Sequence, residues 1–305
     1  MSSIVFRGIE GSNPLGFLAA LGTLRLADLV WRDQEVQLRW IRDGGWRPEL
    51  SGLPIGDGVD FCRVLHEEAP WAPLDAFSAL GKNLTVTRNV FGEVVRSAAA
   101  HTRGADRRAA DFVAAFGSDV IEDRDKDRIA YTDLCFITGS GHQHFLGTAR
   151  GLAESSGAAH LSEALFGPWR YSDKGLSMRW DPDDAKEYAL RWRDPSIGGA
   201  SSVWGANRLA FEALPLFPTV PKGKGLRTTG FRRHDRLHEF TWPLWTQSAT
   251  MDTVRSLLSL CALQEVAPDR VQLQSMGVGE VFRVQRVRIG QRANFKVSFR
   301  PARAV

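Results

Sequence analysis

The chain has few cysteines and no long apolar run. Its three cysteines, Cys62, Cys135 and Cys261, are far apart in 305 residues, so they form neither a disulfide framework nor a CxxC metal pair. No apolar stretch reaches the roughly 18–20 residues that a transmembrane helix needs. The first residues also lack the basic segment and the cleavage site of a signal peptide. We therefore expect a cytoplasmic protein that has no membrane partner.

The sequence also lacks the motifs of common catalytic sites. It contains no GxSxG, HExxH, GxGxxG or GxxxxGK[ST] pattern and no tandem CxxC motif. The segment that comes nearest is Gly139-Ser140-Gly141-His142-Gln143-His144, which we predict to join a strand to a helix. The free backbone N–H groups of such a turn can hold a phosphate. We predict a structural or phosphate-binding turn, and we predict no enzyme activity, cofactor or metal.

The two histidines of this turn leave one catalytic alternative open. His142 and His144 are two residues apart, so both could face one metal ion from a strand or a turn. No third histidine or carboxylate lies at a recognisable ligand spacing. The alternative is a metal-dependent nuclease centred on His142 and His144.

Acidic residues are scarce in the last third of the chain. Residues 222–305 hold 15 Lys and Arg against 6 Asp and Glu, a net charge of +9, whereas the preceding 221 residues hold 24 against 29, or −5. No acidic residue follows Glu280, but seven cations do: Arg283, Arg286, Arg288, Arg292, Lys296, Arg300 and Arg303. Arginine stays protonated near neutral pH. The positive field of this third is expected to attract polyanions, of which nucleic acid is the commonest large one.

Two basic segments carry the predicted contacts with nucleic acid. Residues 221–236 are rich in Gly, Lys and Arg, which predicts a flexible loop that orders on a phosphate backbone, with a plain solvated loop as the alternative. Residues 281–289 and 294–300 alternate around Gly290-Gln291-Arg292, which predicts a basic β-hairpin, with an edge made soluble by charge as the alternative. We assign backbone contact to Lys222, Lys224, Arg227, Arg232, Arg233 and Arg236, with support from Arg286, Arg288, Lys296 and Arg300.

Strand-like and helix-like segments are interspersed without a regular βαβ rhythm. This order predicts an α+β fold with mixed, largely antiparallel sheets, packed helices and the basic C-terminal hairpin. The clearest helices run from Pro14 to Val30, with Ser12 or Asn13 as the cap, and from Met251 to Val266.

Loop and boundary signals complete the expected organisation. The Pro/Gly-rich stretch from Gly44 to Gly58 predicts a loop, and the apolar run from Tyr131 to Thr138 predicts a strand. The mixed charges of residues 122–128 indicate an exposed connection. We expect a single α+β chain over residues 1–305, with a possible sub-domain boundary near residues 117–128.

Three stretches resemble CRISPR-associated proteins of type I-G (formerly I-U) systems. They are GIEGSNPLGFLAALGTLRL at residues 8–26, GSGHQHFL at residues 139–146 and WGANRLAFEALPLFP at residues 204–218. The first is similar to the opening of those proteins, in which a short strand runs into a Pro-Leu…Leu-Ala-Ala-Leu-Gly…Leu-Arg helix. The resemblance is thinly spread over the first 220 residues, and none of its motifs carries catalysis.

The resemblance implies a subunit of a multisubunit RNA-guided complex, either large-subunit-like or accessory, or an extension associated with the nuclease that the complex recruits. In such complexes base pairing reads the sequence, while protein subunits hold the backbone and a short flanking duplex. The leading hypothesis is therefore a non-catalytic subunit that binds CRISPR RNA, target DNA or both beside other effector subunits. A further alternative is a protein-interaction module whose acidic residues 1–221 dock on basic partners.

Overall fold

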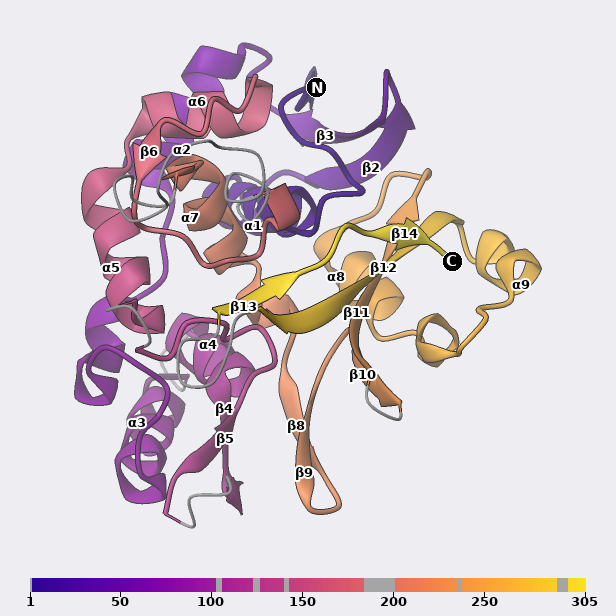
Figure 1. Ribbon diagram of the computed structural model, residues 1–305. Coiled ribbons are helices and arrows are strands. Elements are labelled where there is room, and N and C mark those ends of the chain that lie inside the picture. The colour runs from indigo at the N-terminus through magenta and orange to yellow at the C-terminus, as the bar shows by residue number, and fades with distance from the viewer. Residues whose placement is uncertain are drawn as a thin grey trace, which may run out of the picture.

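The computed structural model describes residues 2–102, 106–122, 127–139, 143–183, 201–234, 237–289 and 296–305. Helices alternate with mostly antiparallel strands along these residues, so the predicted α+β class is confirmed. None of the described helices is long and apolar enough to cross a membrane. Two antiparallel sheets and several helices surround one central helix, α1 (Pro14–Val30), which is visible in the middle of Figure 1.

Helix α1 is buried along nearly its whole length. Every residue from Pro14 to Ala27 is buried. Asn13 caps the helix, because its Oδ1 accepts hydrogen bonds from the N–H groups of Leu15 (2.9 Å) and Gly16 (3.2 Å). The predicted helix, its cap and its proline at the first position are therefore confirmed.

A second helix, α7 (Trp204–Glu212), packs closely against α1. A Cβ atom at Gly22 would strike the carbonyl oxygen of Leu209, so the absence of a side chain permits this approach. Three residues further along α1, Arg25 donates to Glu212 at 2.9 Å, and both side chains are almost fully buried. The charged residue that interrupts the apolar pattern of α1 is thus neutralised by α7.

Two antiparallel sheets flank α1. The first has the order β1 (Ser2–Val5), β3 (Trp46–Leu53), β2 (Gln37–Arg42). The second has the order β10 (Phe231–His234), β11 (Leu237–Trp245), β12 (Val278–Ile289), β13 (Lys296–Phe299), with β14 (Arg303–Ala304) also paired to β12. Phe17 of α1 stacks on Trp40 of the first sheet (5.9 Å between ring centroids) and on Trp242 of the second (5.7 Å). One aromatic core therefore joins both sheets to the central helix.

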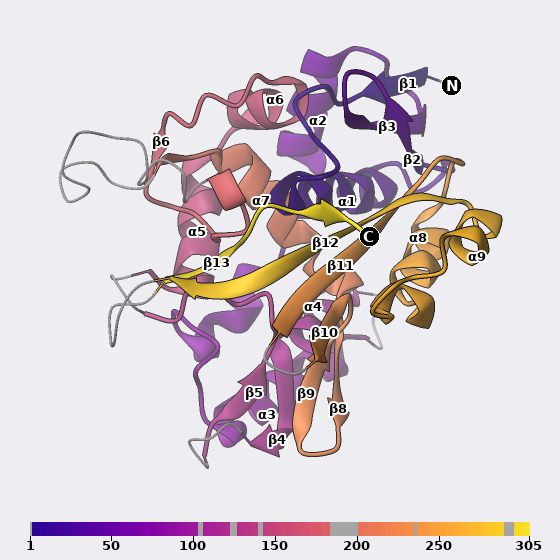
Figure 2. The ribbon, with the colours of Figure 1, turned by 45° about the vertical axis from the view of Figure 1, so that its right-hand side comes forward.

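The remaining elements surround this core. The other helices are α2 (Gly58–Glu68), η1 (Leu74–Leu80), α3 (Arg88–His101), α4 (Arg108–Phe116), α5 (Phe145–Ser155), α6 (Ala158–Phe166), η5 (Leu214–Leu216), α8 (Met251–Leu258), η6 (Cys261–Gln264) and α9 (Arg270–Ser275). The other strands form the pairs β4 (Gly117–Glu122) with β5 (Ile129–Tyr131), β6 (Asp173–Lys174) with β7 (Ser201–Ser202), and β8 (Thr219–Lys222) with β9 (Gly225–Thr228). Figures 1 and 2 show α5, α6 and α7 on one side of the molecule and α8 and α9 on the other.

The stretch from Gly44 to Gly58 is not the predicted loop. It contains β3, the central strand of its sheet, whose residues Trp46, Pro48 and Leu50 are buried in alternation. Pro48 has no N–H group, but its carbonyl oxygen accepts a hydrogen bond from Phe6 (2.9 Å). Burial of the apolar face therefore outweighs the turn propensity of Pro and Gly.

The apolar run from Tyr131 to Thr138 is also not the predicted strand. Only its first residue belongs to β5, and residues 132–137 are buried without regular secondary structure. Their polar groups bond to other segments: Trp180 donates to the carbonyl oxygen of Leu134 (2.9 Å), and the N–H of Asp133 donates to Thr228 (2.9 Å). Tertiary hydrogen bonds thus replace the pairing that a strand would have needed.

Residues 117–128, where a boundary was predicted, include β4 and the start of a hairpin that returns in β5. Phe116 before this hairpin and Ile129 within β5 belong to the same buried hydrophobic cluster. A division of the chain at this place stays a prediction.

Candidate nucleic-acid interface

The first predicted basic segment is a β-hairpin rather than a flexible loop. Strands β8 and β9 pair from Thr219–Thr228 to Lys222–Gly225, and Gly223 turns the chain with φ +61°. The base of the hairpin is held by Thr219, which donates to the carbonyl oxygen of Ala114 in α4 (3.0 Å). Figures 1 and 2 show the hairpin extending from the body of the protein beside β4 and β5. The cations of this segment are therefore presented on an ordered element.

Three cations of this hairpin remain accessible. Lys222 and Lys224 are exposed and Arg227 is half-buried. Within the described part of the chain, no carboxylate forms an ion pair with any of the three. Their charge is therefore available to a ligand, and the contact with nucleic acid stays a prediction.

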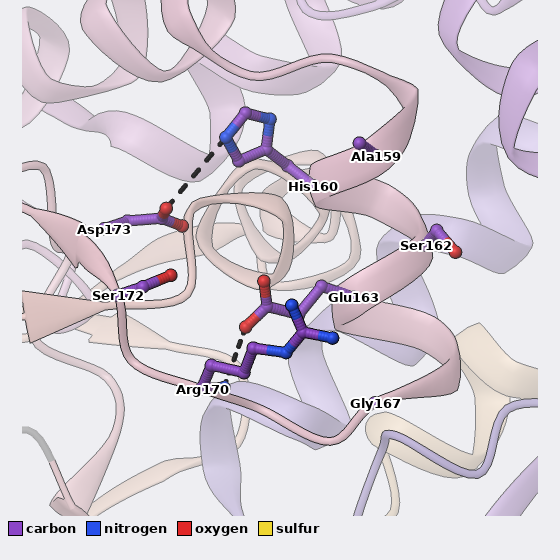
Figure 3. A pocket seen from close by; sticks show the side chains of 8 residues that line it. All are labelled: Ala159, His160, Ser162, Glu163, Gly167, Arg170, Ser172 and Asp173. Carbon is purple, nitrogen blue, oxygen red and sulfur yellow. Dashed lines mark hydrogen bonds and ion pairs between the residues drawn. The ribbon is translucent and has the colours of Figure 1, made fainter.

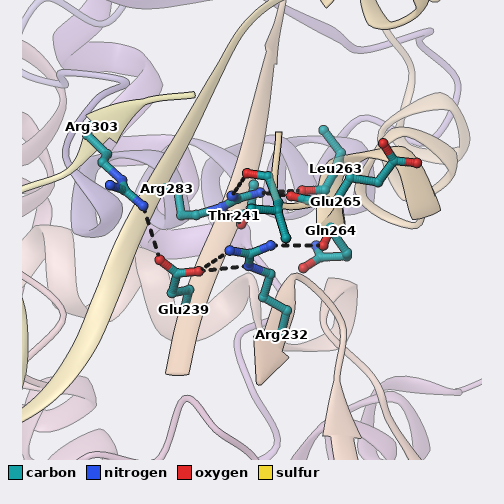
Figure 4. Close-up of polar contacts among 9 residues, drawn as sticks. Arg232, Glu239, Thr241, Leu263, Gln264, Glu265, Arg283 and Arg303 are labelled. Atoms are coloured by element: carbon teal, nitrogen blue, oxygen red, sulfur yellow. Dashed lines mark hydrogen bonds and ion pairs between the residues drawn. The ribbon is translucent and has the colours of Figure 1, made fainter. Parts of the chain in front are cut away.

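Arg232 is internal, which corrects its predicted role. It lies on β10 directly opposite Glu239 of β11, and its Nε and Nη2 atoms lie 2.7 and 2.6 Å from Glu239 Oε2. Its Nη1 donates to the carbonyl oxygen of Gln264 (3.3 Å), and its side chain is 10% exposed. Figure 4 shows this pair on the face of the sheet that η6 covers. Arg232 is therefore buried and directed toward Glu239 and Gln264.

Arg283, on the neighbouring strand β12, fills the same face (Figure 4). Its guanidinium donates to Thr241 (2.9 Å) and to the carbonyl oxygens of Leu263 (3.0 Å), Glu265 (2.7 Å) and Val266 (2.9 Å). Burial lowers the pKa of Arg283 to about 10, so the group stays cationic at neutral pH. Arg232 and Arg283 thus fasten η6 and the residues after it to the sheet.

A third group of cations gathers around Asp133. Arg233 Nη2 lies 2.6 Å from Asp133 Oδ1, and His238 Nε2 lies 3.2 Å from the same oxygen. Burial alone would raise the pKa of Asp133, but the contacts with His238 and Arg233 outweigh it and lower the pKa. Arg233 is half-exposed, so it is the member of this group that solvent reaches.

Arg286 faces inward beside this cluster. Its guanidinium lies 5.0 Å from the centre of the Phe136 ring and donates to the carbonyl oxygen of Cys135 (3.3 Å). Burial lowers the pKa of Arg286. Arg286 is half-buried and contacts the interior of the protein, and its support of a phosphate contact stays a prediction.

The predicted C-terminal hairpin is confirmed. Strands β12 and β13 pair from Arg286–Phe299 to Ile289–Lys296. Arg288, Lys296 and Arg300 are exposed, and for Arg300 no acidic partner lies within the described residues. The outer cations of this hairpin thus agree with the predicted basic face, whereas Arg236 of the first segment lies outside the described residues.

His144 has a defined hydrogen-bonding role at the start of α5. Asn83 Oδ1 accepts from the N–H of Phe145 (2.8 Å), which turns the Asn83 amide nitrogen toward His144 Nδ1 (2.9 Å). Since the amide donates, Nδ1 accepts, and the proton of the neutral ring lies on Nε2. His142 lies outside the described residues, and the described part of the chain contains no group of three or more His, Cys, Asp and Glu arranged to hold a metal ion.

The N-terminus of α5 has fewer free backbone N–H groups for a phosphate than we predicted from the Gly-rich turn. Phe145 donates its N–H to Asn83 Oδ1, and Leu146 and Gly147 donate theirs to the carbonyl oxygen of Lys82 (2.9 and 3.1 Å). Gly139, on the other side of the turn, donates to Gln143 (2.8 Å). These four N–H groups are satisfied within the protein, which corrects the predicted phosphate-binding role for this part of the turn.

A polar cavity of about 360 Å³ lies beside α6 (Figure 3). His160 on its wall accepts a hydrogen bond at Nδ1 from the N–H of Gly157 (3.1 Å), stacks on Trp204 (5.5 Å) and faces Asp173 with Nε2 (4.0 Å). In the neutral ring Nε2 therefore carries the proton, so this nitrogen has no lone pair with which to act as a base. The arrangement orients the ring and supplies no nucleophile–base pair.

No local sequence signal identifies several of these partners. Asp133 and His238 are separated by more than a hundred residues, and His160 meets Asp173 only after an irregular loop. No spacing rule connects such residues, because the fold alone brings them together.

No family model, curated protein or solved structure gives a significant match to this chain.

Proposed function

We propose that this chain is a non-catalytic nucleic-acid-binding subunit of an RNA-guided antiviral effector complex similar to type I-G CRISPR systems. It grips the backbone of guide RNA or target DNA through the exposed cations of the β8–β9 and β12–β13 hairpins. The observation that carries this proposal is the set of three accessible cations, Lys222, Lys224 and Arg227, without an acidic partner in the described residues. Phosphate oxygens are the acceptors that such cations fit.

The geometry of the β8–β9 hairpin favours a backbone contact over base reading. Its strands are paired and its base is fastened to α4, so little conformational freedom is lost when a strand binds. Lysine presents a flexible point charge that follows a phosphate chain without selecting a base. The proposed contact is therefore independent of sequence, as guide–target pairing requires of the protein.

Membership of an effector complex rests on the resemblance of residues 8–26, 139–146 and 204–218 to type I-G proteins. Purification of the native complex, with sequencing of the bound nucleic acid and mass spectrometry of the bound proteins, tests this part. We expect guide RNA together with other effector subunits. Recovery of the chain without either would overturn this part of the proposal.

The backbone contact is tested by the salt dependence of binding. The variant Lys222→Ala/Lys224→Ala/Arg227→Ala is compared with the wild type by fluorescence anisotropy on single-stranded RNA, single-stranded DNA and duplex DNA. Each phosphate contact contributes roughly 0.7–0.9 to the slope of log affinity against log salt, so we expect the slope to flatten by about two to three units. Unrelated sequences should be affected equally.

A matched control removes the same charge from cations that are already paired. Arg63 and Arg255 lie on helices and Arg107 directly precedes α4. All three are at least half exposed, and each forms an ion pair with a carboxylate three or four residues away. The variant Arg63→Ala/Arg107→Ala/Arg255→Ala should leave the slope unchanged. Equal loss in both triple variants would show that net charge alone acts, and absence of wild-type binding would overturn the proposed function.

A further inference from the structure

A second cavity, of about 490 Å³, lies between the segment that precedes α1 and the segment that joins β13 to β14. Its walls come from the loop between β1 and α1, from β3, from the segment after α6 and from residues 182–183. Pro301 and Ala302, between β13 and β14, complete it. The pairing register of β12 shifts by one residue between Phe299 and Arg303, so the chain bulges at this point and carries Pro301 and Ala302 to the cavity.

The walls of this cavity are fixed by close backbone contacts. Gly8 donates to the carbonyl oxygen of Leu165 (2.8 Å), and a Cβ atom on Gly8 would lie 2.5 Å from the nitrogen of Gly167. Gly11 accepts from the indole of Trp242 (2.9 Å), and a side chain at Gly11 would meet the Trp40 ring at 2.7 Å. The absence of a side chain at Gly8 and Gly11 thus permits the loop to pack closely against Gly167 and Trp40.

One buried carboxylate connects three residues of the wall. Asp181 is fully buried, and its oxygens accept hydrogen bonds from Asn13 Nδ2 (2.9 Å), the Tyr171 hydroxyl (2.8 Å) and the N–H of Asp183 (2.9 Å). Asn13, Tyr171 and Asp183 all line the cavity. Burial raises the pKa of Asp181, because it disfavours the charged form of the carboxyl group.

The chemistry of the lining suits a flat, neutral group with both donors and acceptors. Trp169 and Tyr171 are half-buried aromatic residues whose rings meet edge to face at 6.2 Å. The two arginines of the lining are paired with carboxylates, Arg7 with Asp43 (3.1 Å) and Arg47 with Glu10 (3.6 Å). Aromatic surface beside amide, hydroxyl and carboxylate groups is the composition that receives an unstacked nucleobase.

The cavity is also adjacent in the chain to one cation of the proposed contact with nucleic acid. Arg300, exposed and without an acidic partner in the described residues, directly precedes Pro301 of the cavity wall. The chain therefore carries an accessible cation for a phosphate directly beside two residues of the cavity wall. We propose that this cavity receives one unstacked base of the bound single strand, with Trp169 as the stacking surface. This inference rests on the proposed function.

The test uses the full chain and two probes. Saturation-transfer NMR with adenosine 5′-monophosphate reports whether the cavity takes a base by itself, and anisotropy with a single-stranded oligonucleotide and its abasic counterpart reports the contribution of bases to strand binding. In Trp169→Leu we expect loss of transfer to the adenine protons. We also expect affinity for the base-containing strand to fall by roughly 5- to 150-fold, which corresponds to the range found for base–aromatic stacking.

Three comparisons separate stacking from damage to the fold. Trp169→Phe should retain most of the affinity, because it keeps an aromatic face. Trp31→Leu removes another half-buried indole, one that packs on Phe61 away from this cavity, and should bind as the wild type does. Trp169→Leu should keep the wild-type salt slope and the wild-type affinity for the abasic strand.

The outcomes distinguish this inference from the function on which it rests. Unchanged base transfer and unchanged strand affinity in Trp169→Leu would overturn the inference, whatever the hairpin variants show. Transfer to adenosine 5′-monophosphate in a protein that binds no strand would overturn the proposed function and support the cavity as a nucleotide site.

Discussion

The basic third of the chain contains two kinds of cation with opposite surroundings. Arg232 and Arg283 are buried on one face of the second sheet, where a carboxylate, a hydroxyl and main-chain carbonyl oxygens take their hydrogen bonds. Lys222, Lys224 and Arg227 lie on the β8–β9 hairpin without an acidic partner in the described residues. The net charge of a segment includes both kinds of cation equally, although only the second kind is accessible to a ligand.

The buried arginines have a structural reason to be there. The chain from Leu263 to Val266 leaves carbonyl oxygens that no helix or strand satisfies, and a guanidinium offers five N–H donors in a fixed plane. Arg283 bonds three such carbonyls at once. Arg283 therefore supplies the hydrogen-bond donors that regular secondary structure would otherwise provide, so its role is in the fold rather than in binding.

The largest effect is expected from breaking the buried ion pair. Glu239→Ala leaves Arg232 buried beside no carboxylate, and we expect the free energy of unfolding to fall by about 3–5 kcal/mol in denaturant titrations. The double variant Arg232→Met/Glu239→Leu should recover most of this loss, because apolar residues of similar volume need no counter-charge. A small effect of Glu239→Ala would mean that solvent reaches Arg232 and that the two kinds of cation are not distinct.

Removal of Arg283 should cost less but still destabilise the protein. In Arg283→Ala the carbonyl oxygens of Leu263, Glu265 and Val266 lose their donor, and we expect a loss of about 2–4 kcal/mol. Arg300→Ala, at an exposed position, should change the stability by less than about 0.5 kcal/mol. Denaturant midpoints of the two variants measure the difference, and equal losses would contradict the assignment of Arg283 to the interior.

The last prediction concerns Asp133, which contacts the half-exposed Arg233 and the ring of His238. Its lowered pKa means that the folded state favours the carboxylate, so the stabilisation is present above the pKa of the unfolded chain and is lost as the pH falls through the folded pKa. The stability difference between the wild type and Asp133→Asn should therefore shrink on acidification. Thermal melts between about pH 6 and pH 2 check this, and a difference that grows toward low pH would contradict it.

Local features of the sequence predicted the elements that depend on local chemistry. The helix from Pro14 begins where Asn13 can cap it, and the alternating pair at the C-terminus forms the hairpin of β12 and β13. The helix predicted from Met251 to Val266 ends instead at Leu258, and the short helix η6 follows it. The carbonyl oxygens of Leu263 and Val266 accept hydrogen bonds from Arg283 on a distant strand, and no periodicity reveals this contact.

The residue pattern alone predicts the α+β class, the helix from Pro14 to Val30 and the excess of positive charge in the last third. Contacts between distant segments determine which of those charges are available to a ligand. Arg232 and Lys222 are ten residues apart in one basic segment, but Glu239 lies opposite Arg232 in the sheet, whereas Lys222 ends a strand that projects from the body. Strand pairing places a carboxylate beside Arg232 and leaves Lys222 exposed. This difference depends on contacts between segments that are distant in the sequence, so the order of residues does not reveal it.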